Sequence, residues 1–233
     1  MTTIVTGYFG SGKTEFCLNL AMQTGGIIAD LDTVNPYFRS REAGGGRQDV
    51  APTVISDHFG GNTGQDLPAV SLAFLSRVRA GENVIIDLGG GITGLRLLAP
   101  CYDAIRTVPH QFLCVFNLFR PETDSAKKMC AYVDSINDAA QLPITGLVNN
   151  GHMLHHTTAS HVLATQDAAL TTGLPIRYTM LHSAIHAEIG YMLKSDKVIT
   201  FDKLQIRESW LLGDGSRREP SPGSVSAQGD ELC

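Results

Sequence analysis

Near the start of the chain, a lysine and a threonine directly follow a cluster of glycines. Residues 7–14 read Gly-Tyr-Phe-Gly-Ser-Gly-Lys-Thr and match the pattern G-x-x-x-x-G-K-[ST] at every fixed position. Glycines let a backbone turn tightly and direct its N–H groups at phosphate oxygens, and the helix that follows adds a positive dipole end. Lys13 offers a charge for the terminal phosphates, and Thr14 offers a hydroxyl for Mg²⁺. The spacing predicts a phosphate-binding loop, with a ligand-free glycine-rich turn as the alternative.

An aspartate at the end of an apolar run is the second chemical feature. Residues 84–88 read Val-Ile-Ile-Asp-Leu, and three glycines follow. Because parallel strands end at the same edge of a sheet, we expect Asp87 to lie beside the phosphate-binding loop and to hold Mg²⁺ directly or through water. The backbone N–H of Gly90 is then placed to reach the terminal phosphate. The alternative is that Asp87 caps the next helix.

Two further aspartates, Asp30 and Asp32, end the apolar run that starts at residue 27. We expect Asp32 to position or activate a water molecule for attack on the terminal phosphate, and Asp30 is open to a structural hydrogen bond instead. Arg39 and Arg41 follow closely. One interpretation is that they pair with phosphate or with another subunit. The alternative is that they are solvated surface charges.

An asparagine pair, Asn149 and Asn150, ends another apolar run. The side-chain amide of asparagine has a donor and an acceptor, which match an adenine edge. Proteins that select GTP usually place an aspartate two residues after a lysine at this point, and that pattern is missing here. The sequence therefore favours ATP over GTP, and His182 and Ser183, at the end of the next strand, are expected to wall the base.

Apolar runs alternate with helix-like runs along the chain, which predicts an α/β fold. We expect a doubly wound, mostly parallel sheet of about seven strands with helices on both faces. The strand candidates are residues 3–6, 27–31, 83–88, 111–117, 144–149 and 176–181. The helix candidates are residues 13–24, 67–80, 94–102, 123–139, 157–172 and 183–193. Glycine-rich loops at 39–48 and 56–66 are interpreted as functional or as flexible connections.

Composition narrows the class of protein. The 18 basic and 23 acidic residues give a net charge of −5, which argues against a broad nucleic-acid-binding surface. No run of 18 apolar residues occurs, so we expect no transmembrane helix, and the N-terminus does not have the pattern of a signal peptide. Five cysteines without a C-x-x-C pair indicate a reduced, cytoplasmic chain, although a cysteine at a subunit interface could still bind a metal. Residues 1–212 are predicted to form one domain, and residues 213–233 a disordered tail.

Eight histidines include a cluster and a pair at helical spacing, which is a pattern that metal sites can use. These residues are His152, His155, His156, His161, His182 and His186. No cysteine or carboxylate nearby completes a ligand set, so we interpret them as surface or loop histidines.

Together these motifs resemble the MinD/ParA-like P-loop ATPases (the CobQ/CobB/MinD/ParA nucleotide-binding group). The resemblance covers residues 1–212, and residues 30–39 resemble a poorly characterised bacterial subgroup. It implies that Asp32 is the catalytic switch residue, that Asn149 reads adenine, and that a nucleotide-dependent homodimer forms. Many members carry a second lysine early in the loop that reaches across the dimer, and here Tyr8 takes its place. Slow or partner-dependent hydrolysis is therefore expected.

The sequence thus predicts an ATP- and Mg²⁺-binding ATPase that acts as a nucleotide-driven switch on an unknown protein partner. Two alternatives stay open: a metabolic enzyme that transfers the γ-phosphoryl group to a small acid, as dethiobiotin synthetase does, and a non-catalytic ATP sensor. The predicted catalytic residues are Lys13, Asp32 and Asp87, and the predicted metal ligands are Thr14 and Asp87. The predicted nucleotide-binding residues are Gly7, Gly10, Ser11, Gly12, Lys13, Thr14, Glu15, Gly90 and Asn149.

Overall fold

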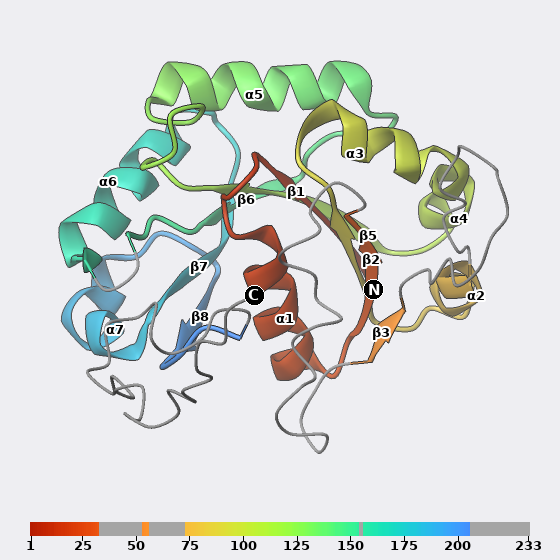
Figure 1. Cartoon of the computed structure of the whole chain (residues 1–233), viewed down its shortest axis with the longest axis horizontal. Helices are drawn as coiled ribbons and strands as arrows, with labels where there is room; N and C mark the ends of the chain where they lie inside the picture. Colours follow the sequence, from red (N-terminus) through yellow and green to blue (C-terminus); the bar gives the residue numbers. More distant parts are fainter. Residues whose placement is uncertain (33–52, 56–72, 154–155, 206–233) are drawn as a thin grey trace, which may run out of the picture.

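The structure is a computed structural model, and it describes residues 1–32, 53–55, 73–153 and 156–205. An eight-stranded sheet in the order β3-β2-β4-β1-β5-β6-β7-β8 forms its centre, and every strand pair is parallel. Helices lie on both faces of this sheet (Figure 1). The predicted doubly wound α/β fold is confirmed, with eight strands where about seven were expected.

Six of the strands correspond to the predicted apolar runs. They are β1 (Thr2–Gly7), β2 (Ile27–Leu31), β4 (Val84–Leu88), β5 (His110–Phe116), β6 (Gly146–Asn149) and β7 (Ile176–His182). The two strands that the sequence did not predict are β3 (Val54–Ile55) and β8 (Lys197–Phe201), which are the two edges of the sheet. Edge strands are buried less evenly than central ones, so β3 and β8 lack a long apolar run.

Seven α-helices connect the strands in the described part of the chain. They are α1 (Lys13–Thr24), α2 (Ala73–Arg79), α3 (Gly91–Leu98), α4 (Tyr102–Arg106), α5 (Ala126–Ala139), α6 (Ala159–Leu170) and α7 (Ser183–Ile189). The 3₁₀ turns η2 (Ala99–Cys101) and η4 (Gly190–Met192) extend α3 and α7. The helix predicted at 94–102 begins three residues earlier, because Gly90 is extended and ends the preceding segment. The helix predicted at 183–193 changes to a 3₁₀ turn after Ile189.

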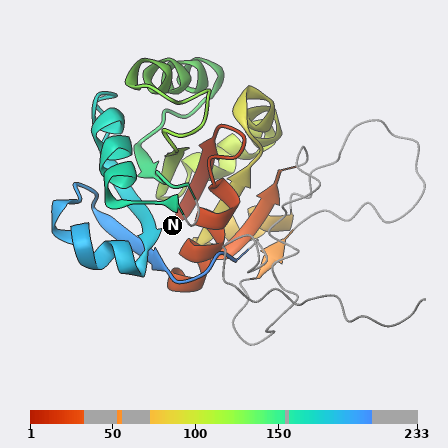
Figure 2. The same ribbon diagram turned by 60° about the vertical axis from the view of Figure 1, so that its left-hand side comes forward.

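The central strands are buried on both faces because successive side chains point in opposite directions. Ile4 packs into the cluster under α2 to α6, and its neighbour Val5 packs into the cluster under α1. Figure 2 shows α1 and α5 well apart, on opposite sides of the sheet. The strand β1 lies between β4 and β5, so the chain passes from one half of the sheet to the other on its way from β4 to β5. A ligand site is expected at the carboxyl ends of strands at such a crossing point.

Several predictions concern segments outside the described residues. These are the glycine-rich loops at 39–48 and 56–66, the tail at 213–233, the first part of the helix predicted at 67–80, and Arg39 and Arg41. Within the described residues, no helix has both the length and the apolar character that a membrane crossing requires.

Candidate phosphate-binding site

The connection from β1 to α1 has the strand–loop–helix form that the motif predicted. Within it, the backbone N–H of Ser11 donates to the carbonyl oxygen of Tyr8 at 3.1 Å, and that of Phe16 donates to Gly12 at 3.0 Å. Gly12 has φ +92° and stands at the N-terminus of α1, a left-handed conformation that favours glycine. The Lys13 ammonium group donates to the carbonyl oxygen of Tyr8 at 3.2 Å, so it lies over the curve of the loop.

Asn150, one residue after β6, holds this loop from the side. Its Nδ2 atom donates to the carbonyl oxygen of Ser11 at 2.7 Å. A side chain on Gly12 would overlap that amide nitrogen, so both conformation and space require glycine there. Asn150 was not among the predicted nucleotide-binding residues, which included its neighbour Asn149. Only its position at the end of a central strand could have indicated it.

Asp87 lies at the end of β4 and is completely buried. Burial, together with the charges of Asp30 and, less strongly, Asp32, raises the pKa of its carboxyl group to about 7, although the Lys13 ammonium and the Thr14 hydroxyl act to lower it. Neither carboxylate oxygen has a hydrogen-bond partner of good geometry within the described residues. A buried carboxylate beside a threonine hydroxyl fits a hard divalent cation with oxygen ligands.

The two aspartates after β2 have different surroundings. Asp30 accepts a hydrogen bond from the backbone N–H of Asp32 at 3.1 Å, which is the structural alternative considered for it. The carboxylate of Asp32 faces Gly89, with its Oδ1 atom 3.1 Å from the point where a Cβ atom on that glycine would lie. Asp32 therefore adjoins the glycine segment that follows Asp87.

Gly90 continues that segment onto the phosphate-binding loop. A Cβ atom on Gly90 would lie 3.1 Å from the backbone nitrogen of Phe9 and 3.6 Å from the carbonyl oxygen of Gly7. The Gly89–Gly90 segment thus contacts Asp32 at one end and Phe9 of the loop at the other. The structure brings together the loop, the two acidic strand ends and the glycine segment.

Asn149 is completely buried, and both ends of its amide are bound within the protein. Its Nδ2 donates to the carbonyl oxygen of Val162 at 3.0 Å, and its Oδ1 accepts from the N–H of Gly151 at 3.1 Å. These bonds hold the start of the loop after β6. A direct contact between Asn149 and a base would require this buried side chain to become accessible first.

Glu15 is also bound within the protein. Its Oε1 atom accepts from Asn19 Nδ2 at 2.8 Å and from the backbone N–H of Gln205 at 2.8 Å. The carboxylate therefore connects the first turn of α1 to the segment after β8. No motif spacing indicates a contact across this length of chain.

His152 differs from the surface role that the sequence suggested, because its ring lies against the loop. Its Nε2 atom is 3.8 Å from the Cβ position of Gly12, and its carbonyl oxygen accepts from Asn117 Nδ2 at 3.0 Å. By contrast, His161 caps α6 and packs on the ring of Phe119, and His182 caps α7. In the part of the chain that the structure describes, no three His, Cys, Asp or Glu residues form a metal-binding group.

No protein-family model and no curated protein matches the sequence. Solved structures similar to it include FtsY of Thermotoga maritima (21% identity, TM-score 0.47) and two structures of the signal recognition particle receptor FtsY of Elizabethkingia anophelis, one in complex with GDP (both 17% identity, TM-scores 0.49 and 0.48). The matches cover 78%, 78% and 76% of this chain, respectively, and 61%, 58% and 56% of those chains. The chain thus spans less than two thirds of the proteins it matches.

The fold and the site together define a P-loop protein of the doubly wound α/β class. Similarity at these identities does not place the chain in a family. The resemblance to the MinD/ParA-like ATPases stays a prediction.

Proposed function

We propose that this chain is a Mg²⁺-dependent nucleoside triphosphatase that hydrolyses ATP to ADP and phosphate. The buried Asp87 carboxylate carries the proposal, because its oxygens lack hydrogen-bond partners of good geometry among the described residues and it adjoins both Lys13 and Thr14. A fully buried carboxylate without such partners costs free energy unless a cation joins it. A P-loop nucleotide brings that cation with it.

In this proposal each group has one role. Lys13 and the N–H groups of residues 7–14 bind the phosphates, and Thr14 and Asp87 hold Mg²⁺, which when bound neutralises phosphate charge. Asp32 orients the attacking water, and it stands beside the Gly89–Gly90 segment that contacts the loop. Hydrolysis then removes the terminal phosphate that the Gly90 N–H binds. The resulting change in the Gly89–Gly90 segment is the signal that a protein partner would recognise. A nucleotide-dependent homodimer is proposed on the resemblance alone.

ATP rather than GTP is proposed because no lysine-x-aspartate pattern follows β6, where Asn149, Asn150 and Gly151 stand instead. Base choice is tested by competition. ATP and GTP are each titrated against a fluorescent ADP analogue bound to the wild-type protein, and tighter binding of GTP would overturn the assignment.

Activity is tested by measuring nucleotide binding and phosphate release side by side, with and without Mg²⁺. The variants are Lys13→Ala, Asp32→Ala and, as a matched control on an exposed surface, Asp103→Ala. We expect Lys13→Ala to lose binding, Asp32→Ala to bind without turnover, and the control to match the wild type. A wild-type protein that binds no nucleoside triphosphate would overturn the proposal.

A further inference from the structure

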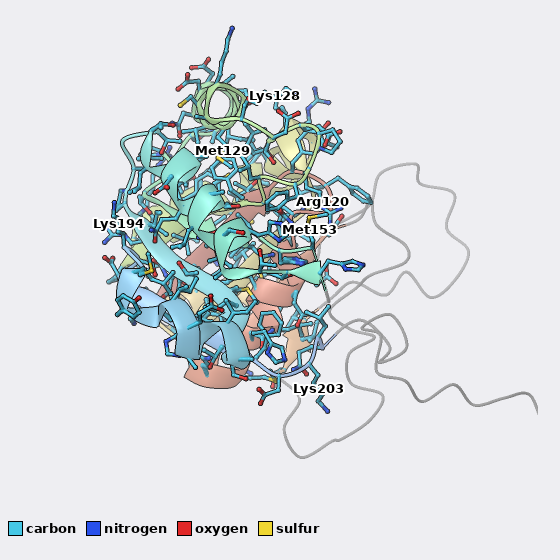
Figure 3. The ribbon with its side chains drawn as sticks, turned by 90° about the vertical axis from the view of Figure 1, so that its left-hand side faces the viewer. Arg120, Lys128, Met129, Met153, Lys194 and Lys203 are labelled. Carbon is cyan, nitrogen blue, oxygen red and sulfur yellow. The ribbon has the colours of Figure 1, made fainter. Side chains whose placement is uncertain are left out.

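The segment after β5 places an arginine directly against the phosphate-binding loop. A Cβ atom built on Gly10 would lie 3.7 Å from both Cζ and Nε of Arg120, and Gly10 stands in the middle of the loop. The Nε atom of Arg120 is itself shielded from solvent. Figure 3 labels Arg120, which lies on the segment that follows β5. The guanidinium group therefore flanks the loop on the side of the β5 and β6 ends.

A hydrogen-bonded turn fixes the backbone that carries this arginine. Asn117, which is completely buried, accepts at its carbonyl oxygen from the N–H of Arg120 at 3.2 Å and from the Thr123 hydroxyl at 2.8 Å. The carbonyl oxygen of Arg120 accepts in turn from the N–H of Thr123 at 2.9 Å. The side chain of Asn117 also donates to the carbonyl oxygen of His152 at 3.0 Å. The turn is thus tied to the other segment that contacts the loop.

The loop itself supplies a single cation, Lys13. Tyr8, the residue after the first glycine of the loop, packs its ring edge-on against Tyr132 of α5, with centroids 5.8 Å apart. Tyr8 is therefore directed toward α5 and brings no charge to the phosphates. A nucleoside triphosphate carries several negative charges, and hydrolysis shifts charge onto the leaving diphosphate. Guanidinium is suited to such a site because it stays protonated and presents a planar fork of donors.

We propose that Arg120 binds the phosphate chain beside Gly10 and stabilises the charge that develops on the leaving diphosphate. In that reaction the water oxygen bonds to the γ-phosphorus, and the bond from this phosphorus to the β–γ bridging oxygen breaks. The electron pair stays on ADP, and the proton of the water leaves to solvent. The proposal rests on the proposed function and adds a cation supplied by the chain's own β5 end.

The test compares Arg120→Ala and Arg120→Lys with Arg106→Ala. Arg106 is a suitable control because its salt bridge to Asp103 and its hydrogen bonds to Gln141 are exposed. Three quantities are measured for each protein: kcat for phosphate release, ADP affinity by calorimetry, and affinity for ADP with aluminium fluoride, which mimics the transition state. Melting temperatures show whether each variant folds.

We expect Arg120→Ala to lower kcat about 100-fold or more, as loss of a single charge-stabilising donor does, and ADP affinity about tenfold. Affinity for the ADP–aluminium fluoride complex should fall in parallel with kcat, and added guanidinium ion should restore part of the rate. Arg120→Lys should recover most of the ADP affinity but little of kcat, because an ammonium group lacks the fork. Arg106→Ala should match the wild type in every measurement.

Two outcomes overturn the proposal. One is an Arg120→Ala variant with wild-type melting temperature whose kcat and ADP affinity lie within about threefold of the wild type, a range below the cost of one charged hydrogen bond. The other is equal loss of kcat in the Ala and Lys variants without any loss of affinity for the transition-state mimic. If the proposed function itself fails, the wild type releases no phosphate. The contact between Arg120 and the phosphate chain is then tested by ADP affinity alone.

Discussion

The side-chain amide of Asn150 donates a hydrogen bond of 2.7 Å to the carbonyl oxygen of Ser11, 139 residues earlier in the chain. This buried bond joins the end of β6 to the phosphate-binding loop. Replacing Asn150 with Ala leaves that carbonyl oxygen without its donor. A buried acceptor without a donor lowers stability by roughly 1–3 kcal/mol. We expect Asn150→Ala to weaken ADP binding about tenfold, measured by calorimetry, because the loop no longer holds its curve.

Asn83→Ala is the matched control. Its side chain also donates to another segment, at 2.9 Å to the Thr24 hydroxyl, but this bond is exposed and lies away from the loop. The control should bind ADP like the wild type. Equal affinities of the two variants would show that the Asn150 bond does not shape the loop.

The raised pKa of Asp87 predicts a pH dependence of stability. Its carboxyl group has an ordinary pKa of 3.8 and a native pKa of about 7. Between these values the native protein holds a proton that the unfolded chain has released, so the contribution of Asp87 to stability falls as pH rises and levels off above about 7. In Mg²⁺-free buffer, the free energy of unfolding of the wild type relative to Asp87→Asn should fall by roughly 2.5 kcal/mol from pH 5 to pH 8.

Urea denaturation of both proteins across that range measures this difference. Comparing the two proteins removes the contributions of other titrating groups, since those are present in both. A difference that stays constant with pH would mean that the buried carboxyl group titrates normally, and the electrostatic basis of the metal site would then be lost.

The sequence predicted those parts of the fold that depend on local patterns, and missed those that depend on contacts between distant segments. The glycine spacing of the loop predicted its conformation, and the apolar runs predicted six strands, because buried parallel strands need continuous apolar residues. β8 was missed since it is an edge strand in which exposed and buried positions mix. Arg120 stands in no motif, and its place over Gly10 follows only from the pairing of β5 with β1.

Buried thiols give a test of the core that is independent of nucleotide. Burial raises the pKa of Cys101 to about 11, and it also raises the pKa of Cys17 and of Cys114 well above the ordinary value. Cys130 is instead half-buried on α5. Because only the thiolate reacts quickly, iodoacetamide at pH 8 should alkylate Cys130 at least about tenfold faster than the other three in the native protein.

Peptide mapping by mass spectrometry distinguishes these four cysteines from one another and from Cys233, and the same reaction in urea provides the control, where all of them should react alike. Rapid native labelling of Cys17 would contradict the packing of α1 against the sheet, since this thiol is completely buried between them.

Gly94 on α3 provides a last prediction, because it packs directly on the glycine segment of the site. A Cβ atom on Gly94 would overlap the carbonyl oxygen of Gly89 and lie 2.9 Å from its carbonyl carbon. Alanine usually stabilises a helix relative to glycine, by about 1 kcal/mol. Here we expect the opposite sign, a loss of roughly 1–3 kcal/mol, because backbone atoms must move to accept the methyl group.

A shift of Gly89 would also change its contact with Asp32, so Gly94→Ala should lower phosphate release more than ADP affinity. Thr93→Ala, at the exposed neighbouring position of α3, is the control, and it should keep wild-type turnover with equal or slightly higher stability. Chemical denaturation and a steady-state phosphate assay measure both effects. If Gly94→Ala were as stable and as active as Thr93→Ala, close packing between α3 and the Gly89 segment would not be what holds Asp32 and Gly90 at the loop.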